Sequence, residues 1–392
     1  MSPTITRSWV AAAAVGLLLL TGCSSVEQQK ADASPGSGES STAAAPGAEA
    51  AQGAVDAASQ PAPAFTAPGP EVTGVADLKG KTVYFVPATY QVPVFQAVQG
   101  SLEAALGTAG IKLEVCDGKS NPANMASCIQ QGIDAEAGAI VTGSIPEDLV
   151  PVAFESARKA GIPVVNLMTA PAGPGKPTEQ AYLTPDYIAL QGLSAKWVIA
   201  DSGAAANVLY VEITDTPATQ IWADQGALAT YEKQCPNCKV TVIKANTGQF
   251  DKLPSLVTSE LTKNPDIDYV QTEVDFAVQP TVEGLQAANA TRVKIASMDG
   301  VLATLQLLKG GQFINSEVGF NADALAWYAA DDALRMITGK PANTNVAFPY
   351  QRMFTADNIG ELGLSPDGEK SGVWYGSTDY RDGFLELWGL KG

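Results

Sequence analysis

The chain has 392 residues, with 24 Lys and Arg against 41 Asp and Glu, no His, and a formal net charge of −17 at pH 7. This acidity argues against nucleic acid and anionic lipid surfaces as partners, because both are bound through basic patches. The lack of His removes the commonest general base and metal ligand, so we expect a protein that is not an enzyme and that holds no cofactor or metal.

The N-terminus has the pattern of an exported protein. Residues 11–20 form an apolar run of about 10 residues, which is too short for a membrane-spanning helix and typical of a signal-peptide core. The run ends at Leu20-Thr21-Gly22-Cys23, which resembles the bacterial lipobox. The resemblance implies that residues 1–22 are a signal peptide and that Cys23 is lipidated. The protein is then extracytoplasmic and held by a lipid anchor at the outer face of the cytoplasmic membrane.

Residues 24–77 are built mainly from Ala, Gly, Pro, Ser, Glu and Gln, and Phe65 is the single aromatic residue among them. A segment of this composition buries too little apolar surface to offset the entropy that is lost on folding. We therefore predict that residues 23–77 are the lipidated Cys and a disordered tether that holds the folded part away from the membrane.

From residue 78 onward, short β-branched runs alternate with amphipathic helical stretches. The first half predicts strands at 81–87, 111–115, 139–142 and 161–167 and helices at 94–109, 124–135 and 149–160. The pattern then restarts, with strands at 207–213, 239–244, 268–272 and 293–298 and helices at 220–233, 253–263, 280–288 and 301–309.

Repeated βαβ units form parallel sheets that are covered by helices on both faces. The predicted fold class is therefore α/β, with two doubly wound parallel-sheet lobes. Such lobes bind ligands at the carboxyl ends of their strands, so we expect a site in the cleft where the two lobes face each other.

Four cysteines remain besides Cys23. An even number in an exported protein indicates two disulfides, and local pairing joins Cys116 to Cys128 and Cys235 to Cys238. Two alternatives stay open. Cys235-Pro-Asn-Cys238 has the spacing of a thioredoxin-type redox motif, although it follows a predicted helix and precedes a strand. The four cysteines together have the number of ligands that a structural zinc ion needs.

Four segments carry a likeness to a known family: Cys116-Asp-Gly-Lys-Ser-Asn-Pro-Ala-Asn-Met-Ala-Ser-Cys128, Ala139-Ile-Val-Thr142, Ala160-Gly-Ile-Pro-Val-Val165 and Ile295-Ala-Ser-Met-Asp-Gly300. Their order and spacing resemble those of the type I periplasmic binding proteins related to ribose-binding protein, the solute-capturing partners of ABC importers. The likeness runs from about residue 79 to 340. It implies a monomeric receptor that closes around a small-molecule ligand and delivers it to an ABC permease.

The resemblance also implies three crossings between the lobes, near Pro185, near Asn321 and near Ala347. These crossings form a three-strand hinge. The N-lobe then comprises residues 79–185 and 321–346, and the C-lobe comprises residues 186–320 and 347–392.

The ligand contacts of the family map onto the loops that follow the predicted strands. The corresponding positions here are Tyr90, Gln91, Phe95, Met168, Thr169, Trp222, Phe250, Asp275, Asp299, Phe320 and Asn321.

The sugar-binding members usually carry an Asp-Arg pair where this chain has Met168-Thr169, and a second Arg in the neighbourhood of Trp222-Ala223, so both arginines are missing here. A buried hydroxyl without a partner costs about 1–3 kcal/mol, so a less polar solute becomes the alternative to a sugar. The resemblance leaves a sensor receptor of the same fold as a second role. A thiol–disulfide protein, a metal-binding protein and a carboxylate-based hydrolase are further alternatives.

Replacing Cys23 with Ser should release the protein from the membrane, because Cys23 is the attachment point that the lipobox predicts. Fractionation of the producing cells measures this release. A Cys23→Ser protein that stays in the membrane fraction would contradict the predicted localisation.

Overall fold

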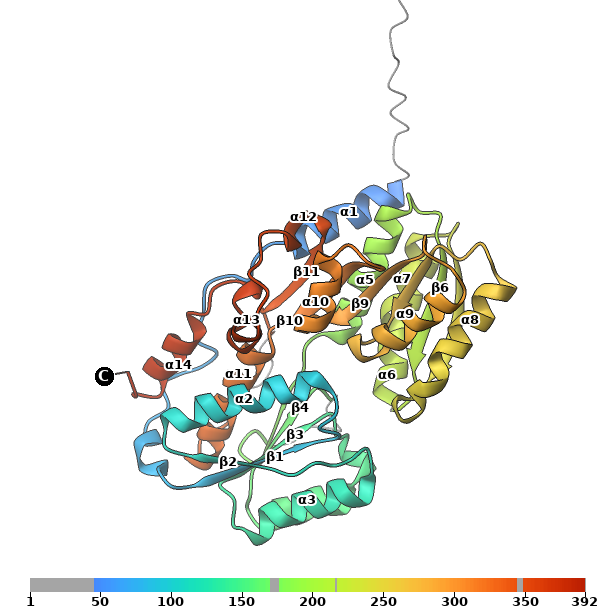
Figure 1. Ribbon diagram of the computed structural model, residues 1–392. Helices are drawn as coiled ribbons and strands as arrows, with labels where there is room; N and C mark the ends of the chain where they lie inside the picture. The colour runs from blue at the N-terminus through green and yellow to red at the C-terminus, as the bar shows by residue number, and fades with distance from the viewer. Residues whose placement is uncertain (1–45, 170–175, 216, 344–347, 392) are drawn as a thin grey trace, which may run out of the picture. The chain divides into compact units, whose positions relative to one another are not determined.

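The computed structural model describes residues 46–391, apart from residues 170–175, 216 and 344–347. Two β-sheets made mainly of parallel strands form its frame, and helices cover both (Figure 1). The α/β class predicted from the alternating pattern is confirmed. Within the described residues, none of the helices combines the length and the apolar character that a membrane span requires.

The first sheet is parallel throughout and has the strand order β2-β1-β3-β4-β5. Its strands are β1 (Thr82–Pro87), β2 (Lys112–Val115), β3 (Ala139–Gly143), β4 (Val164–Leu167) and β5 (Gln180–Leu183). β3 and β4 are buried along their whole length, as continuous apolar strands of a parallel sheet must be. The short edge strand β5 is absent from the sequence prediction.

Helices from distant parts of the chain cover the two faces of the first sheet. On one face, α2 (Pro93–Thr108) packs against α11 (Ala322–Ile337), and on the other α3 (Pro122–Asp134) packs against α4 (Pro151–Lys159). Each pair encloses its own apolar core with alternate side chains of β1, so Phe85 faces α2 while Val86 faces α3.

The second sheet has the order β11-β10-β9-β8-β6-β7. Its strands are β6 (Asn207–Ile213), β7 (Lys239–Ala245), β8 (Tyr269–Thr272), β9 (Lys294–Asp299), β10 (Ile314–Phe320) and β11 (Gln351–Thr355). β11 runs antiparallel to β10, so the expectation of a wholly parallel sheet is wrong at this edge. The sequence prediction contains neither β10 nor β11. β10 was missed because Asn315, Ser316 and Glu317 interrupt its apolar run.

The second sheet is also covered on both faces. One face carries α5 (Tyr187–Asp201), the short helix α6 (Pro217–Trp222), a π-helical segment (Ala223–Leu228) and α7 (Ala229–Gln234). The other face carries α8 (Leu253–Lys263), α9 (Val278–Ala287) and α10 (Leu302–Lys309). α5 is absent from the sequence prediction, since it is buried on several sides and shows no polar stripe.

Three stretches of chain pass between the two sheets. Residues 184–186 join β5 to α5, residue 321 joins β10 to α11, and the described residues 338–343 and 348–350 lie between α11 and β11 in the sequence. The first two coincide with the crossings placed near Pro185 and Asn321, while Ala347 lies outside the described residues. A hinge at these stretches stays a prediction.

The C-terminal part returns to the first sheet. After α12 (Ala356–Ile359) and α13 (Pro366–Ser371), helix α14 (Tyr380–Leu387) packs on α11 (Figure 1). Trp388 stacks on Trp327 of α11 with ring centroids 5.5 Å apart. The prediction that residues 347–392 all belong with the second lobe therefore does not hold for α14, because its aromatic side chains complete the core of α11.

Residues 46–73 form an ordered N-terminal strap along the folded body. It begins with α1 (Pro46–Ala58), whose buried side chains Ala48, Ala51 and Val55 face α5. The backbone amide of Ala62 then donates to the Tyr375 carbonyl oxygen (2.7 Å), and the Phe65 ring lies 4.9 Å from that of Phe384 in α14.

The end of the strap is bound to α11 and α14. Arg335 of α11 donates from Nη2 to the Pro70 carbonyl oxygen (2.8 Å), and the amide of Val72 donates to the Leu387 carbonyl oxygen (2.8 Å). Lys340 donates to the hydroxyl of Thr73 (2.7 Å). The strap thus contacts helices that cover the second sheet and helices that cover the first.

The prediction of a disordered tether is wrong for residues 46–77. Average composition hides the spacing of Ala48, Ala51 and Val55, which places three small apolar side chains on one face of a helix. Packing of this face and hydrogen bonds to the folded body offset the entropy that ordering costs. Residues 23–45 of the predicted tether, and Cys23 itself, lie outside the described residues.

Ala51→Glu should detach α1 and lower the free energy of unfolding by about 1–3 kcal/mol, because it places an unpaired carboxylate where Ala51 is 1% exposed. Ala50→Glu is the matched control, since its neighbouring side chain is exposed. Urea unfolding and limited proteolysis of residues 46–60 measure both changes. Equal behaviour of the two variants would contradict the packing of the strap.

Candidate ligand-binding site

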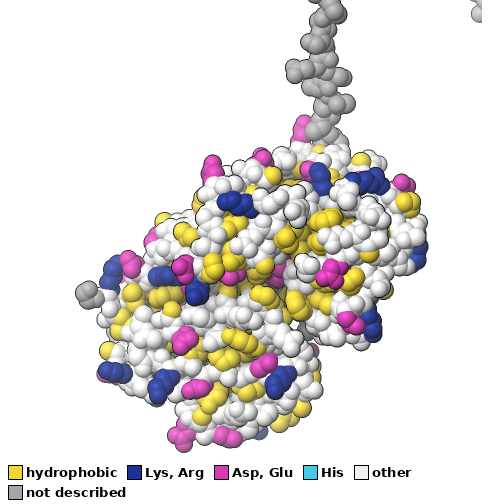
Figure 2. Space-filling view, viewed as in Figure 1, with side chains coloured by type: hydrophobic (Ala, Val, Ile, Leu, Met, Phe, Trp, Pro, Cys, Tyr) yellow, Lys and Arg dark blue, Asp and Glu magenta, His cyan; other side chains and the backbone are white. Residues whose placement is uncertain are grey.

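A cavity of about 380 Å³ lies between the carboxyl ends of the strands of the two sheets. Parallel strands bring the residues that follow them to the same sheet edge, so both sheets contribute. These residues are Ala88, Thr89, Ser144, Met168 and Thr169 from the first sheet and Asp215, Thr247, Val274 and Asp299 from the second. On the face seen in Figure 2, hydrophobic side chains gather where the part that carries the first sheet meets the part that carries the second.

Aromatic rings form part of the cavity wall. The Tyr187 ring, at the start of α5, stacks on Trp222 of α6 with centroids 4.1 Å apart. Phe320 lies behind this pair, edge-on to Tyr187 at 5.8 Å. Phe95 of α2 and Phe276 also line the cavity, and Phe250 supports Phe276 at 5.2 Å. A wall of this kind binds the flat face of an apolar solute.

The rest of the lining is mainly aliphatic, and its charged residues are all acidic. Apolar side chains come from loops and helix ends on both sides: Val92, Val94, Pro122, Met125, Pro146, Leu149 and Ile213. Asp215 and Asp299 are the charged residues of the described lining, which contains no Lys or Arg. Arg352 serves elsewhere, donating to the carbonyl oxygens of Ser59 and Trp374. The cavity therefore offers no cation to an anionic ligand.

Asp215 is held at the cavity rim by the loop after β7. Its carboxylate accepts hydrogen bonds from the Thr247 amide (3.0 Å) and from the Thr247 hydroxyl. Both carboxylate oxygens are thereby engaged, and the side chain is exposed to solvent. Asp215 can contribute to the rim without a strong desolvation cost.

Asp299, at the end of β9, is the buried acidic residue of the lining and is 8% exposed. Its backbone has a φ of 134°, a conformation that strains a residue with a Cβ and that recurs at functional sites. The Tyr375 hydroxyl donates to the Asp299 carbonyl oxygen (3.3 Å), and the Asp275 amide donates to Oδ2 (3.3 Å). These contacts hold the strained end of β9 in the position from which Asp299 lines the cavity.

Asp275 and Asp299 influence each other's protonation. Burial raises the pKa of Asp275 to about 6, although hydrogen bonds from the Val301 amide (3.0 Å) and the Ser297 hydroxyl (2.8 Å) favour its charged form. Burial, and then the nearby charge of Asp275, raise the pKa of Asp299 well above its usual range. Burial also raises the pKa of Tyr187, with a contribution from Asp299.

Five of the expected ligand contacts line the cavity, and six do not. Phe95, Met168, Thr169, Trp222 and Asp299 face its space. Four residues lie one layer behind the wall or at the junction of the sheets: Phe250, Asp275, Phe320 and Asn321. Asn321 caps α11 by accepting from the Ala324 amide (3.0 Å), so its side chain has a structural role there.

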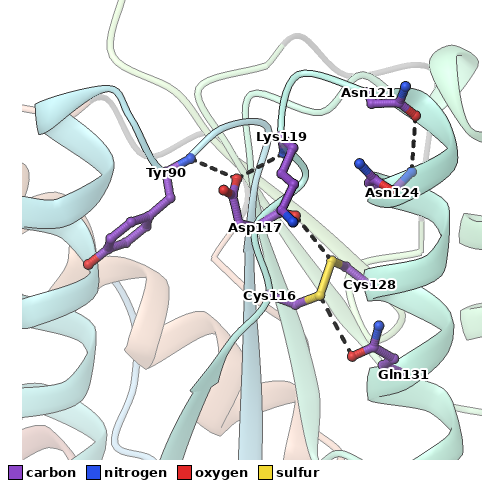
Figure 3. Close-up of a disulfide and its surroundings, with 8 residues drawn as sticks. All are labelled: Tyr90, Cys116, Asp117, Lys119, Asn121, Asn124, Cys128 and Gln131. Carbon is purple, nitrogen blue, oxygen red and sulfur yellow. Dashed lines mark hydrogen bonds between the residues drawn. A yellow bond between two sulfur atoms is a disulfide. The ribbon is translucent and has the colours of Figure 1, made fainter.

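Tyr90 and Gln91 lie outside the cavity wall, since Gln91 is exposed and the Tyr90 hydroxyl donates to Gln99 of α2. Figure 3 shows the reason for this placement. Asp117 accepts hydrogen bonds from the amides of Tyr90 (2.9 Å) and Lys119 (2.8 Å), which ties the loop after β1 to the loop after β2. The cavity is reached instead by Ala88, Thr89 and Val92 from the same loop.

The Cys116–Cys128 and Cys235–Cys238 disulfides confirm the local pairing. The first joins the end of β2 to α3, next to Asp117 (Figure 3). The second staples the turn from α7 to β7. A larger cavity of about 590 Å³ opens beside this turn, but its lining comes from the second sheet and its helices alone. In the described residues, no group of His, Cys, Asp and Glu is arranged to hold a metal ion.

Tyr187 and Phe276 are the main cavity residues that sequence reasoning missed. Each lies close to a position that the sequence indicated: Tyr187 follows the crossing near Pro185, and Phe276 follows Asp275. The signal was therefore the location of the loops, whereas the direction of each side chain required the structure.

Comparison with known proteins gives one family and consistent relatives. A model described as periplasmic binding protein domain matches residues 83–341. The ribose import binding protein RbsB of Escherichia coli K12 is 22% identical over 221 residues, which are 56% of this chain and 72% of that protein.

Solved structures share the fold. A periplasmic solute-binding protein of an ABC transporter from Actinobacillus succinogenes, with bound D-allose, has a TM-score of 0.64 at 18% identity. The matched region is 72% of this chain and 100% of that protein's chain. A sugar ABC transporter protein from Yersinia enterocolitica has a TM-score of 0.67 at 18% identity. The matched region is 84% of this chain and 100% of that protein's chain.

The raised pKa of Asp275 predicts that stability falls as the pH rises. Between the usual Asp pKa of about 4 and the folded value of about 6, the folded state keeps a proton that the unfolded state has lost. The free energy of unfolding should therefore decrease over this range, by up to about 3 kcal/mol from this group.

Urea unfolding between pH 4 and pH 7 measures this slope. Asp275→Asn should make the slope between pH 4 and 6 shallower without removing it, because the raised pKa values of Asp299 and Glu317 act in the same direction. The exposed Asp251→Asn is the matched control. An identical pH dependence in the unmodified protein and in Asp275→Asn would show that Asp275 does not hold its proton.

Proposed function

The chain belongs to the periplasmic binding protein family, the solute-binding proteins of ABC transporters, and we propose that it is a lipid-anchored receptor that delivers a small molecule to an ABC permease. In this proposal Cys23 carries the anchor at the outer face of the cytoplasmic membrane. The ligand is held between the two sheets, and the residues that surround each sheet act as one lobe. The stretches at residues 184–186, 321 and 338–350 act as the hinge on which the lobes close.

The observation that carries the proposal is the convergence of both sheets on one cavity. Its size lies in the range of about 300–1,000 Å³ that small-molecule sites occupy, and its wall combines apolar side chains with a few polar groups. Met168 and Thr169 approach it from the first sheet, and Trp222 and Asp299 from the second. A ligand that touches both sides favours the closed arrangement.

The lining supports a weakly polar ligand rather than a polyhydroxylated sugar. A sugar needs several hydrogen-bond partners that are already in place, and cationic donors are the strongest of these. The described lining has no Lys or Arg and presents Phe95, Trp222 and Tyr187 instead. D-allose and ribose are named for relatives that share only 18% and 22% of their residues with this chain. The two sugars are therefore compounds to test against this chain and do not identify its ligand.

The other roles considered have less support. A receptor for a membrane sensor would use the same cavity, so uptake of labelled ligand by cells with and without the chain separates import from sensing. Both cysteine pairs form disulfides, and Cys235–Cys238 lies in the turn from α7 to β7 rather than at the start of a helix that follows a strand, where a thioredoxin-type motif lies. The relatives are named as binding proteins, and the sequence contains no His to serve as a general base.

The ligand class is tested by thermal unfolding of the Cys23→Ser protein with D-ribose, D-allose, benzoate, benzyl alcohol and acetophenone. A compound present at about 100 times its Kd adds about 2.7 kcal/mol of stability, which is readily detected. We expect stabilisation by the uncharged aromatic compounds and none by benzoate, whose carboxylate would lose its hydration in a described lining without Lys or Arg and close to the charged Asp275.

Trp222→Ala should remove this stabilisation, whereas the neighbouring, half-exposed Ile221→Ala should keep it. Stabilisation by the sugars alone would restore the ligand class of the relatives. No stabilisation by any compound, with no effect of Trp222→Ala, would count against a receptor for solutes of this kind.

A further inference from the structure

Three buried carboxyl groups meet beneath the ligand cavity. Asp275 is 7% exposed, Asp299 8% and Glu317 fully buried. They come from consecutive elements of the second sheet: the loop after β8, the end of β9 and the middle of β10. The Asp275 amide donates to Asp299 Oδ2 (3.3 Å), and the Gly300 amide donates to Glu317 Oε1 (2.9 Å).

No positive charge compensates this cluster within the described residues. None of the three carboxyl groups forms an ion pair with Lys or Arg there. The titratable groups that face it from the surrounding elements are the hydroxyls of Tyr187 and Tyr375 and the further carboxyl group of Glu273. Burying three uncompensated carboxylates together is far more costly than keeping protons on some of them.

The hydrogen bonds indicate which group carries the charge. Asp275 receives donors from Ser297 and Val301 on its two oxygens, and both stabilise a carboxylate. Glu317 Oε2 is buried and receives no hydrogen bond from a described donor, while the carboxyl group of Glu317 lies within hydrogen-bonding reach of that of Asp275, which favours a proton on Glu317 and a charge on Asp275. Asp299 receives a single long hydrogen bond, on Oδ2, and lines the cavity. Asp275 is therefore the best site for the negative charge, and Asp299 and Glu317 are the sites for protons.

We propose that Asp299 is a neutral carboxylic acid whose O–H donates into the cavity, so that the site selects uncharged, mainly apolar solutes that carry a hydrogen-bond acceptor such as a carbonyl oxygen. This inference rests on the proposed binding role of the cavity and names the functional group of the ligand that the cavity recognises. The aromatic and aliphatic wall holds the apolar body of the solute, and Asp299 binds its one polar atom. An ionised Asp299 would instead accept hydrogen bonds from hydroxyl or ammonium groups.

The raised pKa of Asp299 agrees with this geometry and has a further consequence. Because ionised Asp299 cannot donate, affinity for an acceptor-bearing solute should fall as the pH rises through the pKa of this group. Once Asp299 is ionised, the fall should approach tenfold per pH unit. A solute that binds through its own donor would show the opposite pH dependence.

Infrared spectroscopy tests the protonation without any ligand. The carbonyl-stretch band of a protonated carboxylic acid should be present in the Cys23→Ser protein at neutral pH and should lose intensity in its Asp299→Asn derivative. Glu317→Gln should remove a separate component and serves as the matched control for a second buried acid. Absence of any change on Asp299→Asn would overturn the neutral-acid assignment.

Binding of acetophenone and ethylbenzene tests the ligand class, since the two have similar shapes and only acetophenone has an acceptor. Acetophenone should bind at least tenfold more tightly. Asp299→Asn, which keeps an N–H donor and cannot ionise, should retain this preference and abolish its pH dependence. Asp299→Ala should lose the preference, so that acetophenone and ethylbenzene then bind with affinities within about threefold of each other.

The outcomes separate this inference from the proposed function. Binding of sugars that Asp299→Asn abolishes would overturn the inference and leave the receptor function standing. Failure of every compound to bind while the acid band persists would overturn the receptor function and the ligand class, and the protonation of Asp299 would remain.

Discussion

The direction of the strands in the two sheets is the constraint on which the rest of this structure depends. The connected parallel strands in each sheet end at one edge, and the loops that follow them must meet there. Here the two edges face a common cavity, so Met168 and Thr169 approach from one side and Val274 and Asp299 from the other. Most side chains that line the cavity consequently come from short loops, while the strands and helices behind these loops provide the rigid support. The disulfide Cys116–Cys128 and the hydrogen bonds of Asp117 hold one such loop pair in place.

The same arrangement explains the composition of the cavity. Side chains at strand ends sit between a buried core and an open cleft, and most of those found here are apolar or aromatic. With no Lys or Arg in the described lining, a carboxyl group at Asp299 can remain buried only with a proton or with a donor from the ligand. Its neighbours Asp275 and Glu317 make the proton the better solution. In the proposed receptor, affinity, ligand class and pH dependence would all be set by the carboxyl groups of Asp275, Asp299 and Glu317.

Segments distant in sequence link the parts that surround the two sheets. The N-terminal strap packs its helix α1 on α5 and then continues along the body to α11 and α14. At its end, Arg335 of α11 binds the Pro70 carbonyl oxygen and pairs with Asp331 at 2.7 Å. The fully buried Arg335 needs these partners, because an unpaired buried guanidinium would be highly unfavourable. Their presence means that residues 46–77 are part of the folded domain.

The sequence by itself determined the fold class, because the alternation of β-branched runs with amphipathic helices is a local property of the chain. It also indicated the pairing of four cysteines and the loops near Met168, Trp222 and Asp299, since these follow from order along the chain. It could not determine that Tyr187 stacks on Trp222 while Tyr90 turns away toward Gln99. Nor could composition reveal that Ala48, Ala51 and Val55 fit the surface of α5. Only the tertiary structure decided these points, because they depend on which surfaces meet across long sequence separations, and on where burial leaves a polar group without a partner.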